Sequence, residues 1–166
     1  LDGETRYTYD LLGNMTSITD AEGQTTQFVY DGLGRLTEVI DPVIESGTDK
    51  TVRFTYDEAG NVLTRTDRLD RVTRYTYDRL NRMRFTEFAA DSRFESHTYD
   101  IYGDLVETAN DDVTYTYTYD DHHRMTSKTD SRLNRTLSWD YDPGGNVTRK
   151  TDYQGDVTQC QYDSTN

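Results

Sequence analysis

The sequence predicts an all-β protein made of tandem antiparallel β-hairpin repeats of about 21 residues, which form one continuous twisted, curved sheet. Three observations support this fold class. The dipeptide Tyr-Asp recurs eight times at a nearly fixed interval, aromatic residues alternate with threonine before each pair, and turn-forming residues follow it. A fixed period of this size is typical of stacked supersecondary units. Such a chain is more often a wall or a scaffold than a catalyst.

The Tyr-Asp pairs set the register of the repeats, because successive tyrosines lie 21, 26, 21, 22, 20, 22 and 21 residues apart. A second, mostly aromatic column stands two residues before the tyrosines, and positions two apart share one face of a strand. We expect the two columns to form a structural ladder in which rings stack from repeat to repeat. The tyrosine column is Tyr9, Tyr30, Tyr56, Tyr77, Tyr99, Tyr119, Tyr141 and Tyr162; the second column is Tyr7, Phe28, Phe54, Tyr75, Tyr117 and Trp139, with His97 and Cys160 as substitutes.

The residues after each tyrosine predict a tight turn. Aspartate at the first corner of a type I turn accepts a hydrogen bond from its own backbone two residues on, and glycine at the fourth position supplies the positive φ that closes a bulged hairpin. Asn81 and His123 stand in the glycine column, and both residue types accept positive φ better than most. The predicted turn residues are Asp10 with Gly13, Asp31 with Gly34, Asp57 with Gly60, Asp100 with Gly103, and Asp142 with Gly145.

An apolar column opens each return strand, two residues past the glycine column, and should lie opposite the tyrosine. Its members are Met15, Leu36, Val62, Met83, Leu105, Met125 and Val147. Second turns are expected at Asp20–Gly23, Asp67–Asp70 and Asp152–Gly155, with a longer loop at 41–47 and a tighter corner at 110–112. Each repeat then has two strands and two turns, which predicts roughly fourteen strands.

Neither a linker nor a shift in composition interrupts the repeats. We therefore expect a single array over residues 1–166, with about seven to eight repeats, truncated at both ends. The terminal strands of such a segment would be exposed edges. This leaves an edge-to-edge homo-oligomer open as an arrangement of the protein.

The composition limits the partners. The chain has a formal net charge of -13, which argues against nucleic acid and against an anionic membrane surface. It has no apolar run long enough to span a bilayer, so membrane insertion is not expected. Fourteen tyrosines and five phenylalanines are too many for a disordered coil. The one cysteine, Cys160, cannot form an internal disulfide.

Candidate sites for chemistry have simpler explanations. With 31 acidic residues, close carboxylate pairs are frequent, and turn chemistry explains them better than glycoside hydrolysis does. The pairs at 111–112 and 120–121 lack the ligand order of a calcium loop, and His122 and His123 point to opposite sides of a strand. We expect no catalytic residue, no metal ligand and no cofactor. A hydrolase that uses turn aspartates is kept as a third interpretation.

The motifs beginning at Tyr9, Tyr30 and Tyr141, namely YDLLGNMT, YDGLGRLT and YDPGGNVT, resemble the YD repeat of the rearrangement-hotspot (RHS) family, and the resemblance runs the length of the chain. It implies a β-sheet ribbon that spirals into a hollow shell, as in bacterial polymorphic toxins, insecticidal toxin complexes and animal teneurins. The closing segment of the bacterial shells, rich in Asp-Pro-x-Gly, has no counterpart here. Residues 142–145 are similar only superficially, because they lie in register with the other turns.

The resemblance implies a structural role without turnover: part of a shell wall that encapsulates or presents another domain. The expected partners are the remainder of a larger RHS shell and its cargo domain, in a secreted or cell-surface protein. The alternative is an extracellular adhesion surface, of teneurin or wall-associated type, that binds carbohydrate or protein.

Overall fold

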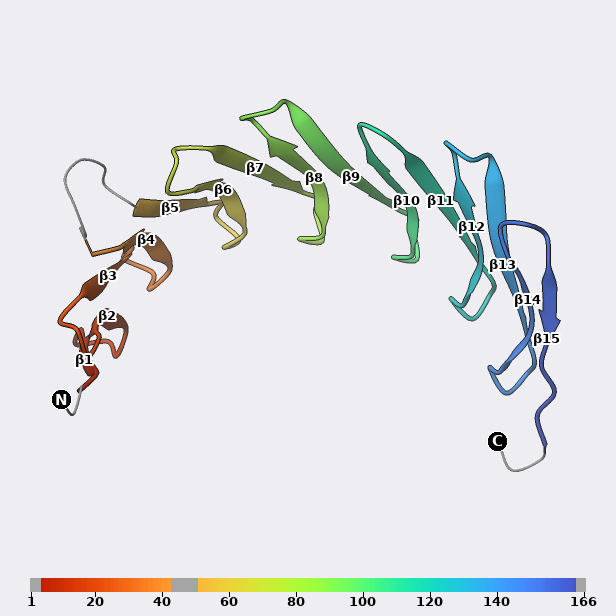
Figure 1. Ribbon diagram of the computed structural model, residues 1–166, viewed down its shortest axis with the longest axis horizontal. Coiled ribbons are helices and arrows are strands. Elements are labelled where there is room, and N and C mark those ends of the chain that lie inside the picture. Colours follow the sequence, from red (N-terminus) through yellow and green to blue (C-terminus); the bar gives the residue numbers. More distant parts are fainter. Residues whose placement is uncertain (1–3, 43–50, 164–166) are drawn as a thin grey trace. The chain divides into compact units, whose positions relative to one another are not determined.

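The computed structural model describes residues 4–42 and 51–163 (Figure 1). In these residues fifteen strands form one open antiparallel sheet in chain order, and no helix is present. The predicted loop at 41–47 lies largely outside the described residues. The strands are β1 (Arg6–Tyr9), β2 (Met15–Thr19), β3 (Thr25–Tyr30), β4 (Leu36–Ile40), β5 (Thr51–Tyr56), β6 (Val62–Thr66), β7 (Val72–Tyr77), β8 (Met83–Phe88), β9 (Arg93–Tyr99), β10 (Leu105–Asn110), β11 (Thr114–Tyr119), β12 (Met125–Asp130), β13 (Arg135–Tyr141), β14 (Val147–Thr151) and β15 (Val157–Gln159).

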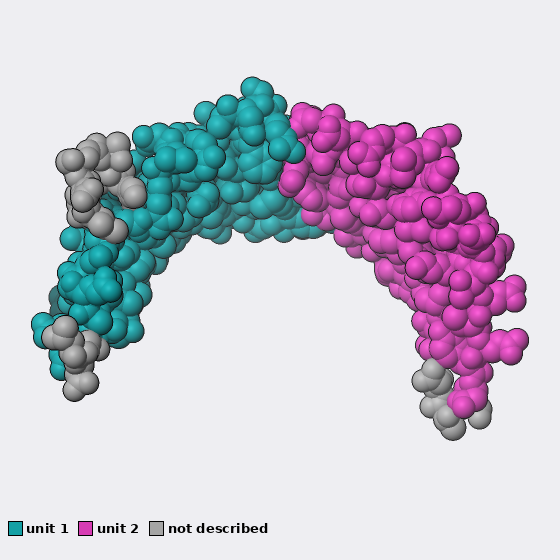
Figure 2. Space-filling view, in the orientation of Figure 1, with its two compact units in different colours: residues 1–93 teal, residues 94–166 magenta. Residues whose placement is uncertain are grey.

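The chain divides into two compact units, residues 1–93 and 94–166, which Figure 2 shows in separate colours. The first contains β1 to β8, and the second contains most of β9 and all of β10 to β15. The single array expected from the sequence stays a prediction. The described part of the chain contains no helix with the length and apolarity needed to cross a bilayer.

In the first unit, four hairpins have the register that the sequence predicted. Each odd-numbered strand ends at a column tyrosine, and that tyrosine lies opposite the apolar residue that opens the return strand. The register shifts by one residue just before the tyrosine, which is the predicted bulge. The facing pairs are Tyr9 with Met15, Tyr30 with Leu36, Tyr56 with Val62, and Tyr77 with Met83.

The second unit repeats the pattern, with Tyr99 opposite Leu105, Tyr119 opposite Met125 and Tyr141 opposite Val147. The last strand departs from it. β15 ends at Gln159, so the prediction that every such strand runs to its tyrosine is wrong for Tyr162. The other seven column tyrosines each pair with the apolar residue six positions later on the return strand.

The sheet is a single layer with two unlike faces. In β5 and β7, the aromatic columns are half-buried and the threonine between them is exposed. Among the described residues, Val52, at 5 % exposure, is the only buried apolar side chain, and no large side chain is fully buried. A thick core is therefore missing, and stability has to come from contacts between neighbouring strands and repeats.

The exposed face is lined by hydroxyl groups that bond across strands. The hydroxyl of Thr55 lies 2.6 Å from that of Thr64, and Thr118 lies 2.8 Å from Thr126 and 2.6 Å from Ser127. Cross-strand threonine pairs stabilise a sheet by a few tenths of a kcal/mol each, roughly 0.2–1. This explains why threonine recurs on a face that contacts solvent.

Candidate functional site: the contacts between repeats

Each Tyr-Asp turn is held by its aspartate. Oδ1 of Asp10 accepts hydrogen bonds from the backbone N–H groups of Leu12 (2.9 Å) and Asn14 (2.8 Å). The N–H of Gly13 donates to the carbonyl oxygen of Asp10 at 3.2 Å, and Gly13 has a φ of +87°. The other predicted glycines also have positive φ: Gly34, Gly60, Gly103 and Gly145. Each of these glycines therefore has the backbone conformation that the turn requires.

Asn81 and His123 take the same backbone conformation as the glycines they replace. Their φ values are +60° and +61°. The N–H of Asn81 donates to the carbonyl oxygen of Asp78 at 3.1 Å, and that of His123 donates to Asp120 at 3.0 Å. Both residues thus occupy the fourth corner of the turn, as predicted.

Hydrogen bonds hold the turn carboxylates in their charged form. The backbone N–H of Arg35 is the main contributor that lowers the pKa of Asp31. The hydrogen bond from the Arg71 side chain, with further bonds from the backbone, lowers the pKa of Asp67 to about 2. A carboxyl group with a depressed pKa is ionised near neutral pH and is a poor general acid. The turn aspartates are therefore held as anions by hydrogen bonds within their own turns.

The column tyrosines bind backward along the chain to the preceding repeat. The phenol of Tyr30 donates to the carbonyl oxygen of Met15 at 2.9 Å, and that of Tyr77 donates to Val62 at 3.1 Å. The acceptor is always the apolar residue opposite the previous column tyrosine. The same bond joins Tyr56 to Leu36, Tyr119 to Leu105, Tyr141 to Met125 and Tyr162 to Val147. The phenol thus ties adjacent repeats through the backbone.

A second contact uses the arginine that follows the turn glycine. Nε of Arg35 donates to Oδ2 of Asp31 at 2.7 Å within its own turn, and Nη1 donates to the carbonyl oxygen of Asp57 in the next repeat at 2.8 Å. Its guanidinium carbon lies 4.7 Å from the centre of the Tyr56 ring. One side chain therefore binds its own turn, the next turn and the next tyrosine.

Arg124 makes the same three contacts in the second unit. Nε donates to Oδ2 of Asp120 at 2.7 Å, and Nη1 donates to the carbonyl oxygen of Asp142 at 2.9 Å. The guanidinium carbon lies 4.7 Å from the centre of the Tyr141 ring. The agreement between the two units shows that the contact belongs to the repeat.

A third contact replaces the arginine contact in other repeats. Nδ2 of Asn61 donates to Oδ1 of Asn81 at 2.9 Å, and Nδ1 of His123 lies 2.7 Å from Oδ2 of Asp104. Both links join the residue after one glycine column to the glycine-column residue of the next turn. The residues after the glycine column alternate in type: Asn14, Arg35, Asn61, Arg82, Asp104, Arg124 and Asn146. The residue type at this position therefore alternates from one repeat to the next.

The second aromatic column contributes differently. The phenol of Tyr117 lies 3.0 Å from the hydroxyl of Thr108, and Nζ of Lys128 lies 5.9 Å from the ring centre of Tyr117. His97 is half-buried, and its Nδ1 has no hydrogen-bond partner. Stacking of equivalent rings from repeat to repeat stays a prediction, because the contacts that join these repeats are phenol to carbonyl and arginine to ring.

The contacts between repeats were not predicted from the sequence, although one pattern in the sequence indicates them. The alternation of arginine with asparagine or aspartate after the glycine column is visible in the residues. Its meaning depends on how far a guanidinium reaches across the sheet. Sequence periodicity does not give that distance.

The acid pairs considered for calcium are used by turns. Oδ2 of Asp111 accepts the N–H of Phe94 at 3.1 Å, and Oδ1 of Asp120 accepts the N–H groups of His122 and Arg124. Within the described ranges, no three His, Cys, Asp or Glu residues are placed to hold a metal ion. An open cleft of about 510 Å³ lies beside these turns, lined by Tyr102, Asp104, Tyr117, Tyr119, Asp120 and His123 among others.

The fold and these contacts define a β-hairpin repeat protein, in which each hairpin binds the hairpins next to it in the chain. The sequence model of the RHS Repeat family matches residues 2–25, 9–43 and 56–93. Residues 2–43 and 56–93 are therefore RHS repeats, and over them the resemblance carried by the Tyr-Asp motifs is confirmed. A search of curated proteins gives no match.

Solved structures of toxin complexes share the fold. A chain of the Tc holotoxin pore of Photorhabdus luminescens superposes with a TM-score of 0.72 at 24 % identity, over 89 % of this chain and 9 % of that one. A chain of the TcdB2-TccC3-Cdc42 crystal structure gives a TM-score of 0.73 at 23 % identity, over 93 % and 9 %. A chain of TcdB2-TccC3 without its hypervariable C-terminal region gives 0.72 at 23 % identity, over 88 % and 9 %. The chain thus spans about a tenth of the length of the proteins it resembles.

Proposed function

We propose that this chain is a passive segment of an RHS shell wall, which encapsulates or presents another domain of a larger protein. The observation that carries the proposal is the tie between successive repeats through phenol, guanidinium or amide groups. A single-layer sheet without a core needs such ties to keep its shape. The RHS repeats and the fold shared with toxin-complex subunits support the same role.

The partners follow from this role. They are the remainder of the shell and its cargo domain, in a secreted or cell-surface protein. The length of the similar chains supports a larger whole, because this segment corresponds to 9 % of each. The segment itself has no turnover in this proposal. Hydrogen bonds within the turns lower the pKa of aspartates such as Asp31 and Asp57, so turn geometry already accounts for these carboxylates.

Cryo-electron microscopy of the longer protein that contains these residues tests the proposal. The expected result is a closed wall in which residues 4–163 form consecutive hairpins around enclosed density. A protease-protection assay adds a second readout, since the enclosed domain should resist digestion until the wall is denatured. The proposal fails if these residues lie on a separate body that encloses nothing, or if no other domain is protected.

A second candidate function, a protein-binding surface, is favoured by apolar side chains on the Tyr-Asp turns. Leu12, Leu33, Leu80 and Tyr102 occupy the same turn position and are 81 %, 77 %, 72 % and 74 % exposed. Exposed apolar patches mark interaction sites. Carbohydrate binding to the aromatic columns has less support, because the phenols of the tyrosine column already bind backbone carbonyls. Glycan-array binding that is lost on changing Tyr56 or Tyr141, with the fold intact, would reverse this preference.

A further inference from the structure

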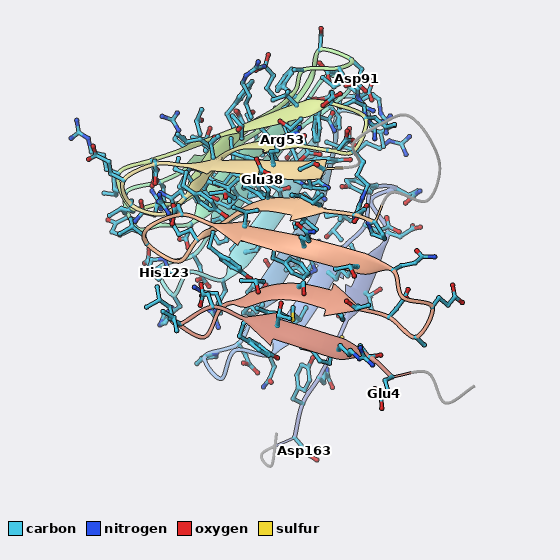
Figure 3. The ribbon with its side chains drawn as sticks, turned by 90° about the vertical axis from the view of Figure 1, so that its left-hand side faces the viewer. Glu4, Glu38, Arg53, Asp91, His123 and Asp163 are labelled. Carbon is cyan, nitrogen blue, oxygen red and sulfur yellow. The ribbon has the colours of Figure 1, made fainter. Side chains whose placement is uncertain are left out.

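One of the links between repeats contains titratable groups. His123, which is labelled in Figure 3, lies on the turn between β11 and β12. Asp104 follows the preceding Tyr-Asp turn. Nδ1 of His123 lies 2.7 Å from Oδ2 of Asp104, and the ring of Tyr102 packs against the imidazole with centroids 5.8 Å apart and planes at 63°. The equivalent link in the first unit is the Asn61–Asn81 pair, which is neutral at every pH of interest. The same position thus holds an amide pair in one unit and an acid-base pair in the other.

The groups around His123 are mostly acidic. Asp100 and Asp104 come from the turn after β9, and Asp120 and Asp121 come from the turn of His123 itself. The remaining titratable groups nearby are Tyr102 in the turn, Tyr117 and Tyr119 on β11, and the neighbouring His122. Arg124, the next residue in the chain, is bound to Asp120. The local field therefore favours the imidazolium ion. The hydrogen bond and charge of Asp104, assisted by Asp100 and Asp120, raise the pKa of His123.

We propose that the Asp104–His123 link makes the junction between these two repeats sensitive to pH, tighter in weak acid than in weak base. Below neutral pH the imidazolium pairs with the carboxylate through a charge-assisted hydrogen bond. As the pH rises, the ring loses one proton to solvent. The remaining proton on Nδ1 can still donate to Oδ2, but the attraction between opposite charges is gone.

The direction follows from linkage. A histidine whose pKa is raised by folding adds stability that is fully present below its unfolded value, near 6.5, and is lost as the pH rises through the folded value. The turn aspartates behave in the opposite way, because their pKa is lowered and their contribution disappears only in acid. The link therefore responds near neutral pH, where the carboxylates of the turns stay ionised.

An NMR titration of the three histidine rings of the 166-residue chain tests the inference directly. Spectra of His97→Asn, His122→Asn and His123→Asn assign the signals. The His123 signal should have its midpoint above 6.5, and the midpoint should fall in Asp104→Asn and in high salt. A wild-type midpoint at or below 6.5, or one that Asp104→Asn leaves unchanged, would overturn the proposal.

The amide pair of the first unit supplies a matched control. The double variant Asp104→Asn with His123→Asn copies the Asn61–Asn81 link and should remove the pH response while it keeps the hairpins intact. The readout is hydrogen-exchange protection of the Asp104 N–H, which donates to Oδ1 of Asp100 at 2.9 Å. In the wild type, the protection of the Asp104 N–H, relative to that of the amides in the turn that contains Asn61, should fall between pH 6 and 8. If protection falls equally in the double variant, the Asp104–His123 link does not cause the pH dependence. If the variant does not fold, the NMR titration of the wild type tests the proposal by itself.

Discussion

The phenol of Tyr141 donates a hydrogen bond of 2.8 Å to the carbonyl oxygen of Met125, although the two residues belong to different repeats. Met125 lies opposite Tyr119, the column tyrosine of its own hairpin. Met125 is therefore contacted by two tyrosines, one from its own repeat and one from the next. The same geometry recurs at Tyr30, Tyr56, Tyr77, Tyr119 and Tyr162.

Removing one phenol should weaken one junction. We expect Tyr141→Phe to lower the free energy of unfolding by about 1 kcal/mol, because the carbonyl of Met125 loses its partner while the ring stays in place. Urea unfolding measures the change. Tyr102→Phe is the control, because Tyr102 is 74 % exposed on a turn, and its effect should stay within about 0.5 kcal/mol. Equal effects of the two variants would show that the bond to Met125 adds nothing.

The arginine contact predicts that lysine is a poor substitute. Arg124→Lys keeps the charge, but an ammonium group cannot contact Asp120, the Asp142 carbonyl and the Tyr141 ring together. We expect a loss of roughly 1–2 kcal/mol in the free energy of unfolding. Arg149→Lys is the matched control, because the Arg149 side chain is 51 % exposed and lies 3.8 Å from Asp140. If Arg124→Lys and Arg149→Lys lower the free energy of unfolding equally, the three contacts of Arg124 do not stabilise the protein more than an exposed ion pair does.

The turn geometry predicts that glycine is required at Gly34 but not at Gly32, two residues earlier in the same turn. Gly34 has a φ of +77°, and Gly34→Val should cost about 1–3 kcal/mol because a β-branched residue is strained there. Gly32 lies in the same turn, and a Cβ at Gly32 would meet nothing within 4 Å. Gly32→Ala should therefore be neutral or slightly stabilising. Thermal unfolding of both variants gives the comparison, and similar melting temperatures would contradict the turn assignment.

Acid should weaken the second turn at Asp67. The pKa of this carboxyl group is lowered to about 2, chiefly by the hydrogen bond from Arg71. A depressed pKa means that the group adds stability above its unfolded value and loses it as the pH falls through the folded value. A carboxyl-detected NMR titration should place the Asp67 midpoint near 2. Asp67→Asn should make unfolding less dependent on pH between 2 and 4, and a midpoint near the ordinary value would refute the contact with Arg71.

Much of the fold follows from local rules. The alternation of Tyr-Thr-Tyr fixes the face of each strand, and Asp followed three positions later by glycine fixes each turn, so hairpins such as β7–β8 have the predicted register. These signals span fewer than ten residues and depend on local backbone preferences, which follow directly from the residue types. The strand before Tyr162 is the exception, because β15 ends at Gln159.

The contacts between hairpins could not be predicted in the same way. Nothing in the sequence says that the phenol of Tyr77 reaches the carbonyl of Val62, because that distance depends on the offset between neighbouring hairpins. The contact between the Arg35 guanidinium and the ring of Tyr56 was likewise not predicted. The partnership of Asp104 with His123 is also invisible in the sequence, since 19 positions separate them.

The phenol bonds all point the same way, from a later repeat to an earlier one. During synthesis, each hairpin leaves the ribosome before the one whose tyrosine will bind it, and every newly made hairpin finds its acceptor carbonyl already in place. Tyr30, for example, needs only Met15, which precedes it. The protein can therefore be assembled vectorially, one hairpin at a time, without waiting for distant parts of the chain.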